Sequence, residues 1–447
     1  MKKLIRILLL AVLLPLLVLP LFAQNIQRMD EIANYYYNQK QFMGSVLVAR
    51  GDQAVFSKSY GYANLEWHNS FTADTKFRLG SLTKQFTAAC IMLLQEDGKL
   101  KTSDPISKYM PDAPAAWRTI TLRNLLTHTS GIPNFTSLPD YPRTQALPTT
   151  PEQTIARFRD LPLDFQPGEK FAYSNSNYIL LGYIIEKTSG ESYIQFLTQR
   201  ILQPLGLNDT GYDSPRILPH RAAGHTMHDK EIENTSLIDM TVPYAAGSLY
   251  STTTDLMRWN LGIYGGRLLK PASLTEMTTP FKDNYAYGIG VTVEYGRKKI
   301  SHGGGIDGFN TSLIYFPEDR VSVVALSNLN GRGVDEIANK AADIFYGKPV
   351  VLPSERKEVQ APQATLQGYV GEYQTGEPPH VITVFLKDGV LMAQIQGQPA
   401  FQLHPESETK FFLKEVDAEV EFVGNASGKA KELVLYQGGE TIHWLRK

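Results

Sequence analysis

The spacing of apolar and polar residues predicts strands near the start of the chain and helices after them. A helical stretch at Ile26–Asn38 precedes two strand-like runs, Gly44–Arg50 and Gln53–Tyr60, which meet at a Gly-Asp pair typical of a hairpin. From Ser81 to Met240 the pattern is mainly helical, with proline-rich loops such as Pro133–Pro151 between the helical segments.

Strand-like runs return late in the chain and are followed by one more helix. Short links such as Pro317–Asp319 join them, so we expect antiparallel pairing in one sheet built from both ends of this region. The pattern predicts an α+β fold, an antiparallel sheet flanked by helices with a helical region inserted. The late runs are Tyr287–Tyr295, Lys299–His302, Thr311–Phe316 and Arg320–Ser327, and the closing helix is Val334–Phe345.

The pattern changes after residue 346. Residues 347–363 carry several prolines and alternating charges, which indicates a linker between a first domain at 24–346 and a second at 364–447. Short runs separated by Asp-Gly, Asn-Ala-Ser-Gly and Gly-Gly turns predict a small all-β barrel or sandwich there. The expected strands are Val381–Leu386, Val390–Ile395, Lys410–Leu413, Glu419–Val423 and Glu432–Tyr436.

The composition is that of a folded protein without a strong charge of either sign. Of the 447 residues, 43% are apolar, and 44 basic side chains nearly balance 45 acidic ones. Because no field of one sign attracts a polyanion, we expect no nucleic-acid partner.

The first 23 residues have the features of a secretory signal peptide. Met1–Arg6 is basic, Ile7–Phe22 is almost wholly apolar, and Ala23 precedes polar residues, so we expect cleavage after Ala23. The alternative is a permanent membrane anchor, against which Pro15 and Pro20 argue. A periplasmic or secreted protein without a membrane segment after cleavage follows from the signal-peptide interpretation.

The candidate chemistry begins with Ser81 and Lys84. Ser-x-x-Lys occurs three times, but only this copy opens a stretch that reads as an amphipathic helix, ending at Gly98. Side chains three residues apart share a helix face, so the Lys84 amine can reach the Ser81 hydroxyl. Ser81 is therefore either a simple helix cap beside a solvated lysine, or a nucleophile with its proton acceptor at a helix N-terminus that favours an oxyanion.

Two further stretches favour the second interpretation. Tyr173-Ser-Asn175 lies between a Pro-Gly turn and a helix expected from Asn177 to Thr188, where its polar side chains either cap the helix or serve a site. His302 begins the run His-Gly-Gly-Gly at the end of an expected strand. Glycines at a strand end either form a loose turn beside a surface histidine or allow a ligand to lie along the strand edge.

These motifs, in this order, resemble the serine β-lactamase and penicillin-binding protein superfamily, most closely its class C β-lactamase, D-alanyl-D-alanine carboxypeptidase and esterase branch. The resemblance covers about 26–346 and extends to "ITLRNLLTHTSGIP" from Ile120, "PLGLNDTGY" from Pro204, "AAGSLYSTTTDLMRW" from Ala245 and "HGGGIDGFNTSLIYFP" from His302. The part from about Leu366 resembles the lipocalin-like barrels appended to some members.

The resemblance implies a site and an activity. Ser81 would be the nucleophile that forms an acyl-enzyme, with Lys84 and Tyr173 sharing the role of general base. It assigns substrate contacts to Asn175, His302 and Gly304, and the oxyanion hole to the backbone N–H groups of Ser81 and Gly305. The expected substrate is a small molecule or peptide, peptidoglycan-derived peptides among them, and no cofactor is implied.

One position departs from the efficient β-lactamases. They carry lysine where this chain has His302, and histidine is typical of peptidase- and esterase-like members, so we expect a peptidase, amidase or esterase. A β-lactamase proper and a non-catalytic receptor stay as alternatives. The charge of His302 would then depend on pH near neutrality.

The remaining reactive residues are expected to be structural. Cys90 falls within a run of apolar helical positions and should be a buried thiol. His225 and His228 have no accompanying acidic or cysteine ligands at a convincing spacing, so we expect no metal site. His128, within "LLTHTSG", is interpreted as a structural histidine of the helical region.

Overall fold

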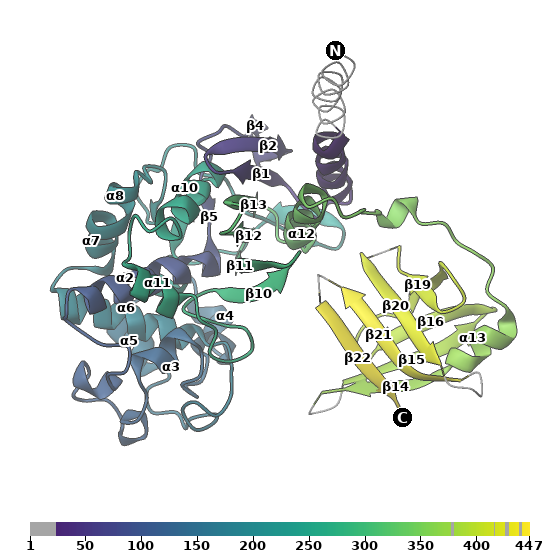
Figure 1. Ribbon diagram of the computed structural model, residues 1–447. Coiled ribbons are helices and arrows are strands. Elements are labelled where there is room, and N and C mark those ends of the chain that lie inside the picture. Colours follow the sequence, from purple (N-terminus) through teal and green to yellow (C-terminus); the bar gives the residue numbers. More distant parts are fainter. Residues whose placement is uncertain (1–23, 377–379, 415, 425–428, 438–439) are drawn as a thin grey trace, which may run out of the picture. The chain divides into compact units, whose positions relative to one another are not determined.

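A computed structural model of the chain describes residues 24–376, 380–414, 416–424, 429–437 and 440–447. The expected signal peptide, at residues 1–23, lies outside the described residues. The chain divides into two compact units, Met1–Tyr346 and Gly347–Lys447, shown in Figure 1. No helix among the described residues combines the length and apolar character that a membrane span requires.

An antiparallel sheet built from distant segments forms the centre of the first unit. Its six strands within the described residues lie in the order β10-β11-β12-β13-β1-β2, so β1 pairs with β13. This confirms the predicted α+β fold. The bounds are β1 Gly44–Arg50, β2 Gln53–Tyr60, β10 Gly290–Glu294, β11 Arg297–Ile306, β12 Phe309–Phe316 and β13 Val321–Ser327.

Two strand bounds differ from the prediction in ways that matter for the site. Residues 287–289, expected to open a strand, precede β10. The glycines after His302, expected at a strand end, lie inside β11 and pair with residues 310–312 of β12. The expectation failed because glycine has a low strand propensity, whereas here pairing with a neighbouring strand on one side decides the structure.

Helices surround the sheet, as Figure 1 shows, and residues 24–38 form the first of them. Helices α10 and α12 pack directly on strands of the sheet. The others belong mostly to the helical region between β5 (Phe77–Arg78) and β9 (Leu249–Ser251). The bounds of the labelled helices of this unit are α2 Thr83–Glu96, α3 Leu122–Leu126, α4 Tyr141–Thr144, α5 Pro151–Ala156, α6 Asn175–Ser189, α7 Tyr193–Leu197, α8 Gln203–Leu205, α9 Tyr244–Gly247, α10 Thr253–Ile263, α11 Pro271–Met277 and α12 Gly333–Phe345.

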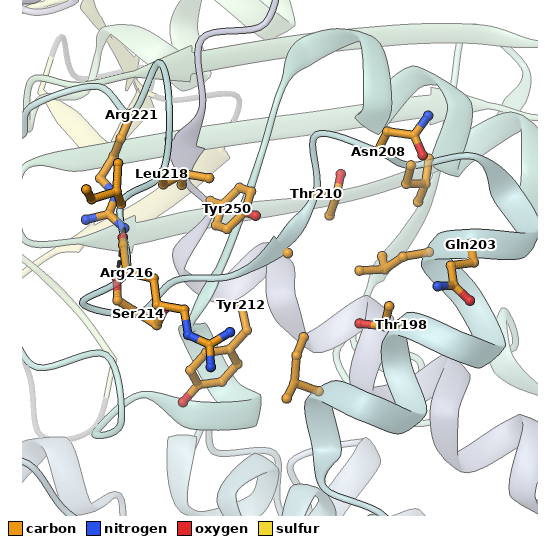
Figure 2. Close-up of a pocket in the computed structure, with 15 residues that line it drawn as sticks. Thr198, Gln203, Asn208, Thr210, Tyr212, Ser214, Arg216, Leu218, Arg221 and Tyr250 are labelled. Atoms are coloured by element: carbon orange, nitrogen blue, oxygen red, sulfur yellow. Dashed lines mark hydrogen bonds between the residues drawn. The ribbon is translucent and has the colours of Figure 1, made fainter.

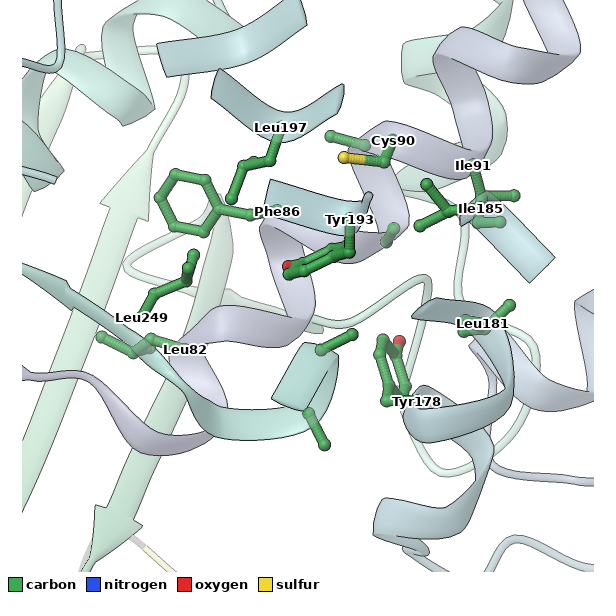
Figure 3. Packing of buried hydrophobic residues seen from close by; sticks show 14 of the residues in the cluster. Leu82, Phe86, Cys90, Ile91, Tyr178, Leu181, Ile185, Tyr193, Leu197 and Leu249 are labelled. Atoms are coloured by element: carbon green, nitrogen blue, oxygen red, sulfur yellow. The ribbon is translucent and has the colours of Figure 1, made fainter. Parts of the chain in front are cut away.

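Helix α2 was expected to be amphipathic, but it is buried on all sides from Thr83 to Leu94. The prediction of an amphipathic helix is therefore wrong. Figure 3 shows its apolar residues packed among side chains of α6, α7 and β9. Its buried polar residues are satisfied: Gln85 Oε1 accepts from Trp259 Nε1 at 3.1 Å, and Thr87 Oγ1 donates to the Ala245 carbonyl at 2.7 Å. These polar residues made the sequence look amphipathic, although they are buried and bonded to other elements of the fold.

The second unit is a nearly closed barrel. Its nine strands within the described residues lie in the order β17-β16-β15-β14-β22-β21-β20-β19-β18. The two outermost strands, β17 and β18, are separated in sequence by Leu403 alone, which brings the open edges of the sheet together. The bounds are α13 Gln363–Tyr369, β14 Gly371–Thr375, β15 His380–Lys387, β16 Val390–Ile395, β17 Phe401–Gln402, β18 His404–Pro405, β19 Lys410–Phe412, β20 Ala418–Gly424, β21 Ala430–Gln437 and β22 Glu440–Arg446.

Candidate active site

Ser81 lies in a tight turn between β5 and α2. Gly80–Leu82 is a single 3-10 turn, and Gly80 has a φ of +53°, a conformation that glycine adopts without strain. The helix itself begins at Thr83, and no side chain caps it. The interpretation of Ser81 as a simple helix cap is therefore wrong, and its hydroxyl faces Lys84 instead.

The Lys84 amine is the centre of the site. Its Nζ lies 3.0 Å from Ser81 Oγ, 2.8 Å from Asn175 Oδ1 and 2.9 Å from the Ala246 carbonyl oxygen. Lys84 is 0% exposed, so the interpretation of this residue as a solvated surface lysine is wrong. Burial lowers the pKa of Lys84 well below its usual range, because the charged form loses its hydration.

Tyr173 lies beside this pair and its pKa moves in the opposite direction. The Lys84 Nζ is 4.9 Å from the centre of the Tyr173 ring. Burial raises the Tyr173 pKa, and the Ser81 hydroxyl opposes this effect by hydrogen bonding. Because Tyr173 as a whole is 37% exposed, water screens part of the increase. The Lys84 amine is thus the more readily deprotonated of the two.

His302 is bonded on both ring nitrogens. Nδ1 lies 2.5 Å from the Gly303 carbonyl oxygen, which only accepts, so we assign the ring proton to Nδ1. Nε2 then accepts from the Tyr285 hydroxyl at 2.9 Å. Burial, and next the charge of Lys84, lower the pKa of His302 to about 4. The expectation of a charge that changes near neutral pH is therefore wrong, because the partly buried ring loses hydration that would stabilise its charged form.

The glycines of β11 allow the strand to lie against the Ser81 turn. A Cβ atom on Gly304 would stand 2.1 Å from the Leu79 carbonyl oxygen and 2.3 Å from Thr311 Oγ1. Strand β10 pairs only with residues 297–301 of β11, so the following residues form a strand edge with no partner on that side among the described residues. The loose-turn interpretation is wrong, and an unpaired edge lies next to the serine.

The Asn175 side chain is the link between Lys84 and a loop. Its Oδ1 accepts from Lys84, while its Nδ2 donates to Thr136 Oγ1 at 3.2 Å. Asn175 begins α6, two residues earlier than expected, and its backbone N–H donates to Asn134 Oδ1 at 3.0 Å. The structure therefore brings Asn175 to Ser81 and Lys84, and its contact with substrate stays a prediction.

Two residues at the site have no signal in the local sequence. Tyr285 bonds His302, and His128 is 0% exposed with its ring centre 4.3 Å from that of Tyr173. His128 Nδ1 accepts from the Ser174 N–H at 3.2 Å, so it also fixes the segment that carries Tyr173. These contacts join residues 17 and 46 positions apart, which spacing within one element does not reveal.

A separate cavity of about 440 Å³ lies elsewhere in the first unit. Figure 2 shows Arg216 and Arg221 on one side and Thr198 and Gln203 on the other. None of the side chains described above lines it. Among the described residues, no group of three or more histidine, cysteine, aspartate or glutamate side chains is placed to bind a metal, and Cys90 is fully buried.

The fold and the buried lysine beside Ser81 define the class: serine hydrolases of the β-lactamase type. Comparison with known families agrees. The chain belongs to the Beta-lactamase family, whose model matches residues 22–347. Residues 355–444 match a second family described as a domain of unknown function, DUF3471.

Relatives and solved structures extend this likeness to both units. The chain is 32% identical over 429 residues to penicillin-binding protein 4* of Bacillus subtilis, covering 89% of this chain and 94% of that one. It is similar to the structure of an octameric penicillin-binding protein homologue from Pyrococcus abyssi, with a TM-score of 0.69, 25% identity and coverage of 94% and 100%. A D-stereospecific amidohydrolase from Streptomyces sp. aligns with a TM-score of 0.59, 27% identity and coverage of 67% and 93%.

Proposed function

We propose that the protein is an exported serine hydrolase that forms an acyl-enzyme on Ser81 and acts on a peptide, amide or ester. The observation that carries this proposal is the wholly buried Lys84 amine, 3.0 Å from the Ser81 hydroxyl. A neutral amine has two N–H donors and one lone pair. Since Asn175 Oδ1 and the Ala246 carbonyl oxygen can only accept, they take the two donors and leave the lone pair for the Ser81 O–H.

In the proposed reaction, Lys84 accepts the Ser81 proton as Oγ forms its bond to the substrate carbonyl carbon. Tyr173, whose pKa is raised, retains its proton and donates it to the leaving group as the bond to that group breaks. Water then attacks the acyl carbonyl carbon and gives a proton to Tyr173. As the bond from that carbon to Ser81 Oγ breaks, Lys84 returns its proton to Oγ, and the acid is released. His302 lies beside Tyr173, with 6.2 Å between the two ring centres. It is neutral and accepts a hydrogen bond from Tyr285, so it borders the leaving-group side of the site without a charge.

The backbone N–H groups of Ser81 and Gly305 form the proposed oxyanion hole. The position of a Cβ atom on Gly80 is 3.0 Å from Gly305 N and 2.8 Å from Gly305 O, which supports this close pairing of turn and strand. Gly304, the residue before Gly305, also allows β11 to lie close to the Ser81 turn, because it has no Cβ atom to meet the Leu79 carbonyl oxygen. Loss of one such donor costs roughly 10²- to 10³-fold in kcat in comparable sites.

A hydrolysis screen tests the proposed function. Purified protein is given a D-alanyl-D-alanine peptide, a D-amino-acid amide, a short-chain p-nitrophenyl ester and a chromogenic cephalosporin. We expect turnover of at least one of the first three, lost in Lys84→Ala. A penicillin that binds tightly without turnover of any of these compounds would instead support the non-catalytic receptor, and fastest turnover of the cephalosporin would support a β-lactamase proper.

Export is part of the proposal and has its own test. The basic and apolar start of the chain supports it, together with the small residue Ala23. Mass spectrometry of protein expressed from the full chain in a bacterial host is expected to show an N-terminus at Gln24. An N-terminus that retains Met1 in exported protein would contradict the cleavage.

A further inference from the structure

One loop contacts both the helical side and the sheet side of the site around Ser81. At its start, Asn134 and Thr136 bond Asn175 on the helical wall. At its end, Gln145 Nε2 donates to Asp307 Oδ2 at 3.0 Å on the sheet wall. The contact between Gln145 and Asp307 therefore ties the end of this loop to the turn after β11.

Asp307 follows β11 directly, in the two-residue turn that joins β11 to β12. Its half-buried carboxylate has Gln145 as its hydrogen-bond donor and makes no ion pair among the described residues. Burial raises the pKa of Asp307. The hydrogen bond from Gln145 and the charge of Arg78 lower it, but by less than burial raises it. Arg78 itself is committed to Asp213, with Nε 2.8 Å from Oδ2. Asp307 is thus a carboxylate without a cation of its own.

The proposed chemistry sets the direction in which a substrate would lie along β11. The leaving group must receive a proton from Tyr173, whose ring centre lies 6.2 Å from that of His302. The leaving group therefore occupies the His302 end of β11, and the acyl part extends past Gly305 toward Asp307. At a rise of about 3.3 Å per residue, Asp307 lies roughly 7 Å beyond Gly305. That is within reach of an amine near the scissile carbonyl.

The charges at the two ends favour one kind of substrate. At the leaving-group end His302 is neutral. The Lys84 amine, neutral in the proposed reaction, donates to Asn175 Oδ1 and the Ala246 carbonyl oxygen and accepts from the Ser81 hydroxyl. Neither group therefore presents a free cation to a carboxylate. At the acyl end Asp307 presents a negative charge. A substrate with a cationic acyl end and an uncharged leaving group matches this arrangement.

Building on the proposed function, we infer that Asp307, oriented by Gln145, binds the free α-ammonium group of the acyl residue. The substrate is then an unblocked amino-acid amide, or a peptide cleaved from its N-terminal end, and not a peptide recognised by its C-terminal carboxylate. Aspartate is also a common turn residue. However, the Asp307 carboxylate accepts a hydrogen bond from Gln145 of the loop that also contacts Asn175, and the experiment separates the two roles.

The test uses two substrates that differ only in acetylation of the amine, D-alanine p-nitroanilide and its N-acetyl form, with p-nitrophenyl acetate as a reference. In the full chain we expect the free amine to be preferred. In Asp307→Asn we expect kcat/KM for the free amine to fall roughly 10- to 100-fold, the strength of a charged hydrogen bond, with little change for the other two compounds. Asp52→Asn, a matched change in the exposed turn between β1 and β2, is expected to change none of the three.

Two results would overturn the inference while the proposed function stands. One is a preference of the wild type for the acetylated substrate together with normal ester turnover. The other is an equal loss for all three compounds in Asp307→Asn, which would mean that Asp307 only positions the loop. If the wild type hydrolysed none of the compounds and Ser81 could not be acylated, the proposed function would fail, and this inference with it.

Discussion

Replacing Gly304 by alanine tests whether the serine turn is positioned by its contact with β11. The new Cβ atom would stand 2.1 Å from the Leu79 carbonyl oxygen, although such contacts are essentially never below 3.0 Å. Strand and turn would therefore have to separate by about 1 Å, because the obstructing atom belongs to the backbone and cannot rotate away. Gly303→Ala is a matched control, since its Cβ would meet nothing closer than 3.6 Å.

The size of the effect follows from this geometry. A displacement of about 1 Å in a catalytic arrangement costs on the order of 10²-fold in rate. Overpacking of this kind also lowers the free energy of unfolding by about 1–3 kcal/mol. We expect Gly304→Ala to show both effects, and Gly303→Ala to remain within a few-fold of wild-type activity.

The assay combines kcat/KM for a p-nitrophenyl ester with urea unfolding of both variants. The unfolding curves show whether a variant is still folded under the assay conditions. If it is, its lost activity reflects a displaced turn and not an unfolded protein. If Gly304→Ala retained activity equal to that of Gly303→Ala, the contact between Leu79 and β11 would not position Ser81. Equal losses in both variants would contradict the argument as well.

Three more predictions follow from other contacts. The pKa of His302 is about 4 in the folded protein and 6.5 in the unfolded chain, so the unfolded chain binds more protons between these pH values. Acidification from pH 6.5 to 4 should therefore lower the free energy of unfolding by up to about 3 kcal/mol. Urea unfolding across this range should show a shallower fall for His302→Gln, and identical curves would contradict the assignment. Asp213 is 1% exposed and paired with Arg78 and Arg221, so Asp213→Asn should lower the free energy of unfolding by about 3 kcal/mol. Chemical denaturation measures this change, and a decrease below about 1 kcal/mol would argue against a buried ion pair. The buried Cys90 should resist a thiol reagent in the native protein and react fully in denaturant, whereas rapid native labelling would contradict its burial.

The sequence predicted the sheet and the barrel well because both depend on short apolar runs and turn residues. That β1 and the late strands belong to one sheet, for example, could be expected from strands at both ends of a helical region. The burial of α2 on all sides was not predictable, since Gln85 and Thr87 find their partners on distant elements. Local pattern shows which residues are polar, but not which of them are satisfied inside the protein.

The site shows the same division. Ser81 and Lys84 are one helical turn apart, so their contact could be expected from spacing. Tyr285 could not be expected, because its hydrogen bond to His302 depends on how two segments meet in the fold. The charge of His302 was predicted wrongly for a related reason, since burial is a property of the whole fold and not of the motif.

The most direct test of the account is to identify the residue that a fluorophosphonate labels. Digestion and mass spectrometry should locate the added mass on the peptide that contains Ser81. The label should be absent in Ser81→Ala and form much more slowly in Lys84→Ala, because the buried amine activates the hydroxyl. Labelling of another residue, or an undiminished rate without Lys84, would contradict the central claim.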